Sequence, residues 1–163
     1  MAPKDDKVDW YPFEDGRDDT GELTQDLLTS IEQKLANNPD MELAGVLWVQ
    51  GESDTGYADQ YQANLTELHR LLTESFGDDF VFTVSQLSEN MDWFQGYSGQ
   101  LAIQEAQEAF VDATDGTTLL DPDDAIAAYG LSPEEAVADA IHFNDDGADA
   151  ISQAFFDQFY DLM

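Results

Sequence analysis

The feature of this sequence that most limits its fold is a regular alternation between short apolar runs and longer segments with helical periodicity. The first apolar run, Leu43–Val49, is almost continuous, which is typical of a strand buried on both faces of a parallel sheet. Phe80–Val84 and Thr117–Leu120 predict two further strands. Because helical patterns separate these runs, the sequence predicts an α/β fold with an open parallel sheet and flanking helices.

The helical segments are recognised by apolar residues that recur every three or four positions. They cover about 21–36, 57–75, 99–113 and 147–161. A short helix is also expected to begin at Pro133, since proline is favoured at the first helical position. No repeat, low-complexity linker or internal boundary interrupts the pattern, so residues 1–163 are expected to form one domain.

The charge of the chain is strongly negative: 36 Asp and Glu against 5 Lys and Arg give a net charge of −31. Nucleic acids and anionic membranes would be repelled, because both are bound through basic surfaces. Such an excess also opposes compaction by self-repulsion, which salt relieves. A salt-adapted source is therefore our hypothesis, and a merely acidic surface is the alternative.

The chain contains no cysteine, which excludes disulfides, thiolate zinc sites and cysteine nucleophiles. No apolar run approaches the about 20 residues of a membrane-spanning helix. The first ten residues are polar and acidic, so they do not form a signal peptide. These observations leave the compartment open.

Two segments carry candidate catalytic side chains. Gln50-Gly51-Glu52-Ser53-Asp54 directly follows the first predicted strand, and ligand sites of open α/β sheets lie at the carboxyl ends of strands. Asp139 stands three residues before His142, just before the last predicted helix. In a hydrolase, such an aspartate can orient the histidine while the other ring nitrogen accepts a proton.

These residues resemble the sialate O-acetylesterase and carbohydrate esterase family six group of SGNH hydrolases. Gly45–Asp54 is similar to the family block G-x-x-W-x-Q-G-E-S-D. Tyr61–Leu65 resembles its Y-x-x-N-L helix, and Ile103–Gln107 resembles its I-R-E-A-Q helix with Gln104 in place of arginine. Asp139–Phe143 resembles its D-x-x-H-F block, and Asp9-Trp10 fits the upstream segment.

The resemblance implies hydrolysis of acetyl esters on sugars without a metal or other cofactor. A serine in a G-Q-S-N block would attack the ester carbonyl, with His142 as its base and Asp139 orienting that base. Gln50 would donate to the oxyanion, while Gly51, Glu52 and Ser53 would shape the loop. The expected partner is an acetylated carbohydrate, and members of the family are often exported.

The sequence departs from the family in one respect: no G-Q-S-N block is present. In the family this block follows a strand that would lie beside Leu43–Val49. We therefore expect a partial SGNH domain that lacks its N-terminal strands. Its first strand would have an open edge, which a partner chain could cover.

Other interpretations remain open. The chain could be a non-catalytic remnant or a carbohydrate-binding pseudoenzyme. It could also be an acidic calcium-binding module, although the segment nearest to an EF-hand loop has His142 in the first position and Gln153 in place of the final glutamate. His69 is expected on a helix surface, and Trp93 is a candidate for stacking on a sugar.

Overall fold

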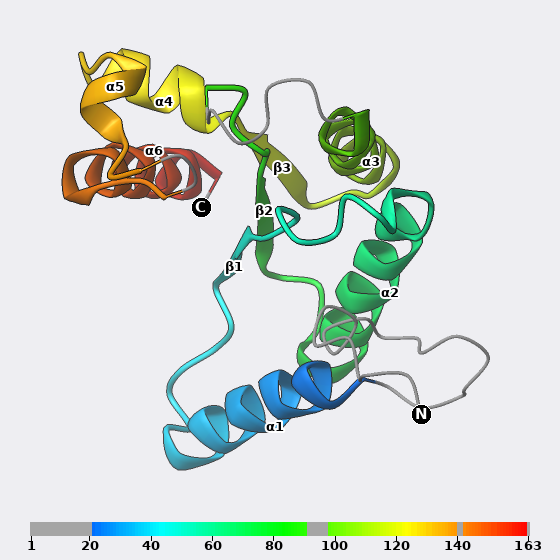
Figure 1. The fold of residues 1–163 in the computed structure, drawn as a ribbon. Helices are drawn as coiled ribbons and strands as arrows, with labels where there is room; N and C mark the ends of the chain where they lie inside the picture. Colours follow the sequence, from blue (N-terminus) through cyan, green and yellow to red (C-terminus); the bar gives the residue numbers. More distant parts are fainter. Residues whose placement is uncertain (1–20, 91–97, 140–141, 163) are drawn as a thin grey trace.

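A parallel sheet with helices on both faces forms the centre of the protein, as the computed structural model shows for residues 21–90, 98–139 and 142–162 (Figure 1). The elements in chain order are α1 (Glu22–Asn37), β1 (Gly45–Val49), α2 (Ala58–Phe76), β2 (Val81–Ser85), α3 (Ser98–Ala113), β3 (Thr117–Leu120), α4 (Pro122–Ala128), α5 (Pro133–Ala136) and α6 (Asp145–Leu162).

The described strands form one sheet in the order β1-β2-β3, and both pairs are parallel. The predicted α/β class with an open parallel sheet is therefore confirmed. Val49 is aligned with Ser85, and Ser85 with Leu120. The three strands consequently end at the same edge of the sheet.

The main core lies on the face of the sheet that α2 and α3 cover (Figure 1). Tyr61, Leu65 and Leu68 of α2 are almost completely buried there, against Phe82 of β2 and Phe110 of α3. A smaller apolar cluster joins α4, α5 and α6 on the other side. The long helices thus turn most of the apolar side that their periodicity predicted toward a core, but Leu23 of α1 and Leu101 of α3, expected on those sides, are 53% and 57% exposed.

Strand β1 forms an edge of the described sheet, and its side chains are only partly covered. Leu47 is 53% exposed and Val49 is 58% exposed, so the prediction of a strand buried on both faces is wrong for these positions. An apolar groove of about 720 Å³ lies beside them, between α1, residues 41–45 and α6. Apolar side chains line it, among them Ile31, Phe155 and Phe159. The open edge expected for this strand is present in the described part of the chain.

The helices near the C-terminus differ in detail from the sequence predictions. Helix α5 begins at Pro133 as expected. Helix α4 was not predicted; the Asp121 carboxylate caps it by accepting the backbone N–H groups of Asp123 and Asp124. Helix α6 starts two residues earlier than expected, since the side-chain carbonyl of Asn144 accepts the Gly147 N–H at 3.0 Å.

His69 is not the surface histidine that the sequence suggested. Its ring is half-buried, and its centroid lies 5.6 Å from those of Phe80 and Phe82 and 6.0 Å from that of Phe110. Burial lowers the pKa of this imidazole below the usual 6.5. His69 is therefore part of the wall of the main core, on the side of α2 that faces the sheet.

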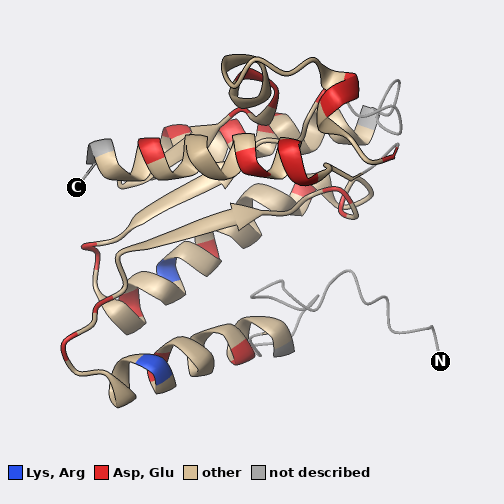
Figure 2. Cartoon of the chain, turned by 90° about the vertical axis from the view of Figure 1, so that its left-hand side faces the viewer, with Lys and Arg blue, Asp and Glu red and all other residues tan. Residues whose placement is uncertain are grey.

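Acidic side chains are spread over all the helices in Figure 2, whereas basic ones are few. Lys34 on α1 and Arg70 on α2 are the lysine and arginine of the described ranges. Arg70 is shared between Glu67 and Glu74 on its own helix. None of the described helices has the length and apolarity that crossing a membrane would require.

Candidate active site

The edge at which the strands end brings two loops together. Gln50 follows β1, and residues 86–90 follow β2. Gln107 of α3 joins these loops from below: its Nε2 donates to the carbonyls of Gln50 and Ser85, each at 3.2 Å, and its Oε1 accepts the Leu87 N–H at 3.2 Å. Gln107 is fully buried, so this amide fixes the two loops relative to each other.

The loop after β1 is a tight turn with a buried carboxylate at its centre. The Asp54 N–H donates to the Gly51 carbonyl at 3.0 Å, and the Asp54 carbonyl accepts the Tyr57 N–H at 2.8 Å. Gly51 has φ +143°, and a Cβ there would lie 2.9 Å from Ile103 Cγ2, so the turn requires glycine. The side chain of Asp54 is fully buried and accepts a hydrogen bond from Gln50 Nε2.

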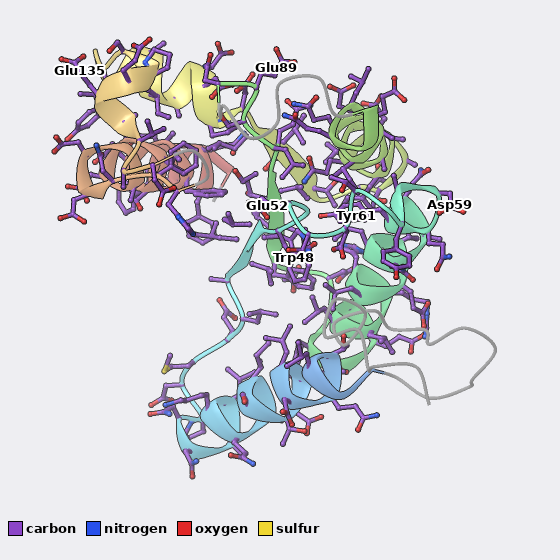
Figure 3. The ribbon with its side chains drawn as sticks, viewed as in Figure 1. Trp48, Glu52, Asp59, Tyr61, Glu89 and Glu135 are labelled. Atoms are coloured by element: carbon purple, nitrogen blue, oxygen red, sulfur yellow. The ribbon has the colours of Figure 1, made fainter. Side chains whose placement is uncertain are left out.

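Two aromatic residues, Tyr61 and Trp48, hold the backbone of Gln50 through a chain of hydrogen bonds. The Tyr61 hydroxyl donates to the Gln50 carbonyl at 2.7 Å and accepts a hydrogen bond from Trp48 Nε1 at 3.3 Å. Burial raises the pKa of Tyr61 well above 10, so the phenol stays a donor. Trp48, Tyr61 and Glu52, which belongs to the same loop as Gln50, are labelled in Figure 3. Trp48 and Tyr61 therefore fix the backbone position of Gln50.

The residues expected to shape this loop have unequal places in it. Gly51 is buried and supplies the unusual backbone angle. Glu52 is partly buried and Ser53 is exposed. The hydrogen bonds that hold the turn run through Gly51, Asp54 and Tyr57.

The loop after β2 is fastened by two more buried glutamines of α3. Gln104 Nε2 donates to the Leu87 carbonyl at 2.7 Å, and Gln100 Nε2 donates to the Ser88 carbonyl at 2.9 Å. On its outer side, Asp123 of α4 accepts bonds from the Ser88 hydroxyl and the Glu89 N–H. The carboxylates of Asp121 and Asp123 thus serve as hydrogen-bond acceptors, the first for the cap of α4 and the second for this loop. Within the described ranges, no cluster of three or more histidine and carboxylate side chains could hold a metal.

Asp139 and His142 form a hydrogen-bonded pair in the connection between α5 and α6. His142 Nδ1 lies 2.9 Å from Asp139 Oδ2 and 3.0 Å from Oδ1, and the His142 backbone N–H donates to Oδ1 at 2.9 Å. The side chains of His142 and Asp139 are 66% and 56% exposed. With Nδ1–H donating to the carboxylate, Nε2 carries the lone pair that a general base needs.

The connection that carries this pair is anchored on both sides. Asn144 Nδ2 donates to the carbonyls of Glu135 and Val137. A Cβ on Gly147 would lie 2.2 Å from the Ala136 carbonyl oxygen, so glycine is needed where α6 meets α5. The segment that carries the exposed Asp139–His142 pair is therefore held firmly against α5 and the start of α6.

Helix α6 shows how two loops lie relative to the sheet: the histidine loop, residues 137–144 between α5 and α6, and the glutamine loop, residues 50–57 after β1. Its Phe159 packs over Gly45, where a Cβ would lie 2.6 Å from the ring, so the C-terminal part of α6 lies over the start of β1. In Figure 2, α6 runs antiparallel to the strands, and its N-terminal end lies on the side to which the arrowheads point. His142 precedes α6 by three residues and therefore belongs to the side of the sheet on which Gln50 lies. Within the described ranges, no hydrogen bond joins His142 to Gln50 or to a serine.

The sequence singled out Gln50, Asp139 and His142 but not the residues that hold them. The sequence placed Asp54 in a motif without indicating its role. It placed Gln100, Gln104 and Gln107 in a predicted helix without indicating that they hold the loops. Their signal was polar residues at intervals of four and three on the apolar face of α3. Trp93 and Asp9-Trp10 lie outside the described residues.

Comparison with known proteins identifies the family of the chain. No curated protein and no solved structure matches the chain. The family described as carbohydrate esterase, sialic acid-specific acetylesterase, matches residues 8–161. This range contains the glutamine loop, its supports and the Asp139–His142 pair. The chain therefore belongs to the sialic acid-specific acetylesterase family of carbohydrate esterases.

Proposed function

We propose that this chain contributes to the hydrolysis of acetyl esters on carbohydrates, with sialate or xylan O-acetyl groups as substrates. The observation that carries the proposal is the Asp139 carboxylate on Nδ1 of His142, in a chain of an acetylesterase family. His142 is the general base, Asp139 orients it, and Gln50 donates a hydrogen bond to the oxyanion. Acetate is the expected product.

The reaction follows the serine hydrolase scheme. A serine hydroxyl attacks the acetyl carbonyl while His142 Nε2 takes its proton, and the Gln50 amide stabilises the oxyanion. His142 then returns the proton to the sugar oxygen as the C–O bond breaks. Water, activated by His142, finally cleaves the acetyl-serine and releases acetate.

The serine itself is the part of this scheme that no motif of the chain supplies, because no G-Q-S-N block is present. All serines of the chain lie in the described ranges and none stands in such a block, so we propose that a partner chain provides the hydroxyl. The same observation favours a second candidate: a carbohydrate-binding pseudoenzyme that retains the base and its aspartate without turnover.

Release of acetate from O-acetylated sialic acid and from acetylated xylan tests the proposal. These substrates are preferable to p-nitrophenyl acetate, because an exposed imidazole such as His142 attacks that activated ester without an enzyme site. We expect Asp139→Asn to lower kcat about 10⁴-fold and His142→Ala to lower it about 10⁶-fold, the losses that removal of the corresponding triad members causes.

Asp145→Asn is the matched control, since Asp145 is an exposed carboxylate at the start of α6, close to the pair. It should leave acetate release unchanged. If the unaltered, folded chain releases no more acetate than His142→Ala, catalysis is excluded for the chain alone. Calorimetric titration with the acetylated sugar would then decide for or against the pseudoenzyme.

A further inference from the structure

We propose that Asp54 is a positioning residue that fixes the orientation of the Gln50 side-chain amide. The inference rests on the proposed function, because it concerns the oxyanion donor of that site. Its basis is the hydrogen bond from Gln50 Nε2 to Asp54 Oδ2 across the turn after β1. Asp54 itself makes no contact with the reacting atoms in this scheme.

The buried state of Asp54 is the first argument. Its side chain is fully buried at the centre of the turn, and an ionised carboxylate is costly there unless hydrogen bonds compensate it. Its backbone N–H and carbonyl are both used to close the turn, with Gly51 and Tyr57. The turn therefore holds the Asp54 carboxylate in place, within hydrogen-bond distance of the Gln50 amide.

The two ends of the Gln50 amide provide the second argument. Its Oε1 is buried and has no hydrogen-bond partner among the described residues, whereas Nε2 donates to Asp54. Turning the amide over would place Oε1 against the carboxylate, where two acceptors repel each other. Asp54 thus fixes the orientation of the amide, with Nε2 toward the carboxylate. In this orientation Oε1 has no hydrogen-bond partner among the described residues.

The remaining freedom of Gln50 is removed through its backbone. The Tyr61 hydroxyl and Gln107 Nε2 both donate to the Gln50 carbonyl, at 2.7 and 3.2 Å. With the main chain held there, the side-chain torsions are the only variables left, and the charge-assisted bond to Asp54 restrains them. One N–H of Nε2 is used by Asp54, and in the proposed reaction the other donates to the oxyanion.

Two variants separate positioning from a merely structural role. In Asp54→Asn the amide loses the charge that orients it. We expect kcat for acetate release to fall about 10- to 100-fold, below the loss of 10²–10³ for a missing donor. KM should stay within about twofold, since the donor acts mainly in the transition state. Asp59→Asn, an exposed acid at the start of α2, is the matched control.

The second variant exchanges the pair, as Gln50→Glu with Asp54→Asn. A carboxylate and an amide then still face each other, so the melting temperature should recover toward that of the unaltered chain. The oxyanion donor is lost, so kcat should stay low. Recovery of kcat in the exchanged pair, or a loss in Asp54→Asn that only follows the unfolded fraction, would overturn the inference.

A spectroscopic readout tests Asp54 even where no turnover exists. The side-chain amide protons of Gln50 can be assigned in a ¹H–¹⁵N spectrum by their absence in Gln50→Ala. We expect one proton at low field, protected from exchange, and its return to ordinary values in Asp54→Asn but not in Asp59→Asn. An unchanged signal refutes the role of Asp54, whereas absent esterase activity with the expected shift refutes only the proposed function.

Discussion

At the scale of single residues, His69 gives the protein a dependence of stability on pH. Its half-buried ring lies among three phenylalanines, and burial lowers its pKa below 6.5. The unfolded chain therefore takes up the proton first as the pH falls. The contribution of neutral His69 to stability is complete above pH 6.5 and decreases as the pH falls from 6.5 to the lower pKa of the folded state.

The test compares unfolding free energies at pH 7.5 and 5.5 in His69→Phe and in the unaltered chain. The many carboxylates titrate in both proteins, so the difference between the two slopes isolates His69. We expect the unaltered chain to lose more stability on acidification than His69→Phe does. Equal slopes for His69→Phe and the unaltered chain would contradict this account.

Gln107 is the residue whose loss should most disturb the site without touching its chemistry. Replacement by leucine keeps much of the volume but leaves buried backbone groups of Gln50, Ser85 and Leu87 without their partner. The free energy of unfolding should fall by about 1–3 kcal/mol. Denaturant titration measures it, and the exposed Glu105→Leu on the same helix should change it far less. A change no larger than that of the control would mean that water replaces the amide.

Much of the candidate site could be predicted at this scale, and what could not has a physical reason. Gln50, Asp139 and His142 are visible because their chemistry is local: a strand end for the first and a three-residue interval for the other two. Gln107 acts on residues that are far away in sequence, 57 positions in the case of Gln50. Such a contact becomes apparent only once the strands are paired.

At the scale of elements, the sequence predicted those whose periodicity extends over several turns or a whole strand. The strands and the long helices were found within a few residues of their observed bounds. Helix α4 was missed because its 7 residues show little more than one apolar repeat. It depends on the Asp121 cap and on packing against α6. The exposure of β1 also required the sheet order, because an apolar run looks the same at an edge and in the middle.

The edge of β1 should govern association of the protein. Leu47 and Val49 are exposed beside unpaired backbone groups of the described sheet, and such edges promote pairing between chains. We expect Leu47→Lys with Val49→Lys to reduce association in 2 M KCl, where charge repulsion is screened. Light scattering measures it. Leu101→Lys, at an equally exposed position on α3, should associate like the unaltered chain; equal reduction by that control would exclude the edge as the cause.

At the scale of the whole molecule, charge dominates. The net charge is −31, and acidic residues occur on all the described helices (Figure 2), so self-repulsion opposes the folded state as a whole. We expect the melting temperature to rise between 0.1 and 2 M KCl, with NaCl acting equally at the same ionic strength. A melting temperature that stays level or falls would remove the hypothesis of salt adaptation.

The order of the strands in space repeats their order along the chain, since β2 lies between β1 and β3. Each strand therefore meets its predecessor after a single intervening helix. The elements that hold the main core, β1, α2, β2 and α3, all leave the ribosome before α6 does. We therefore expect assembly to proceed outward from β1, with the loop that carries His142 added after the loop that carries Gln50.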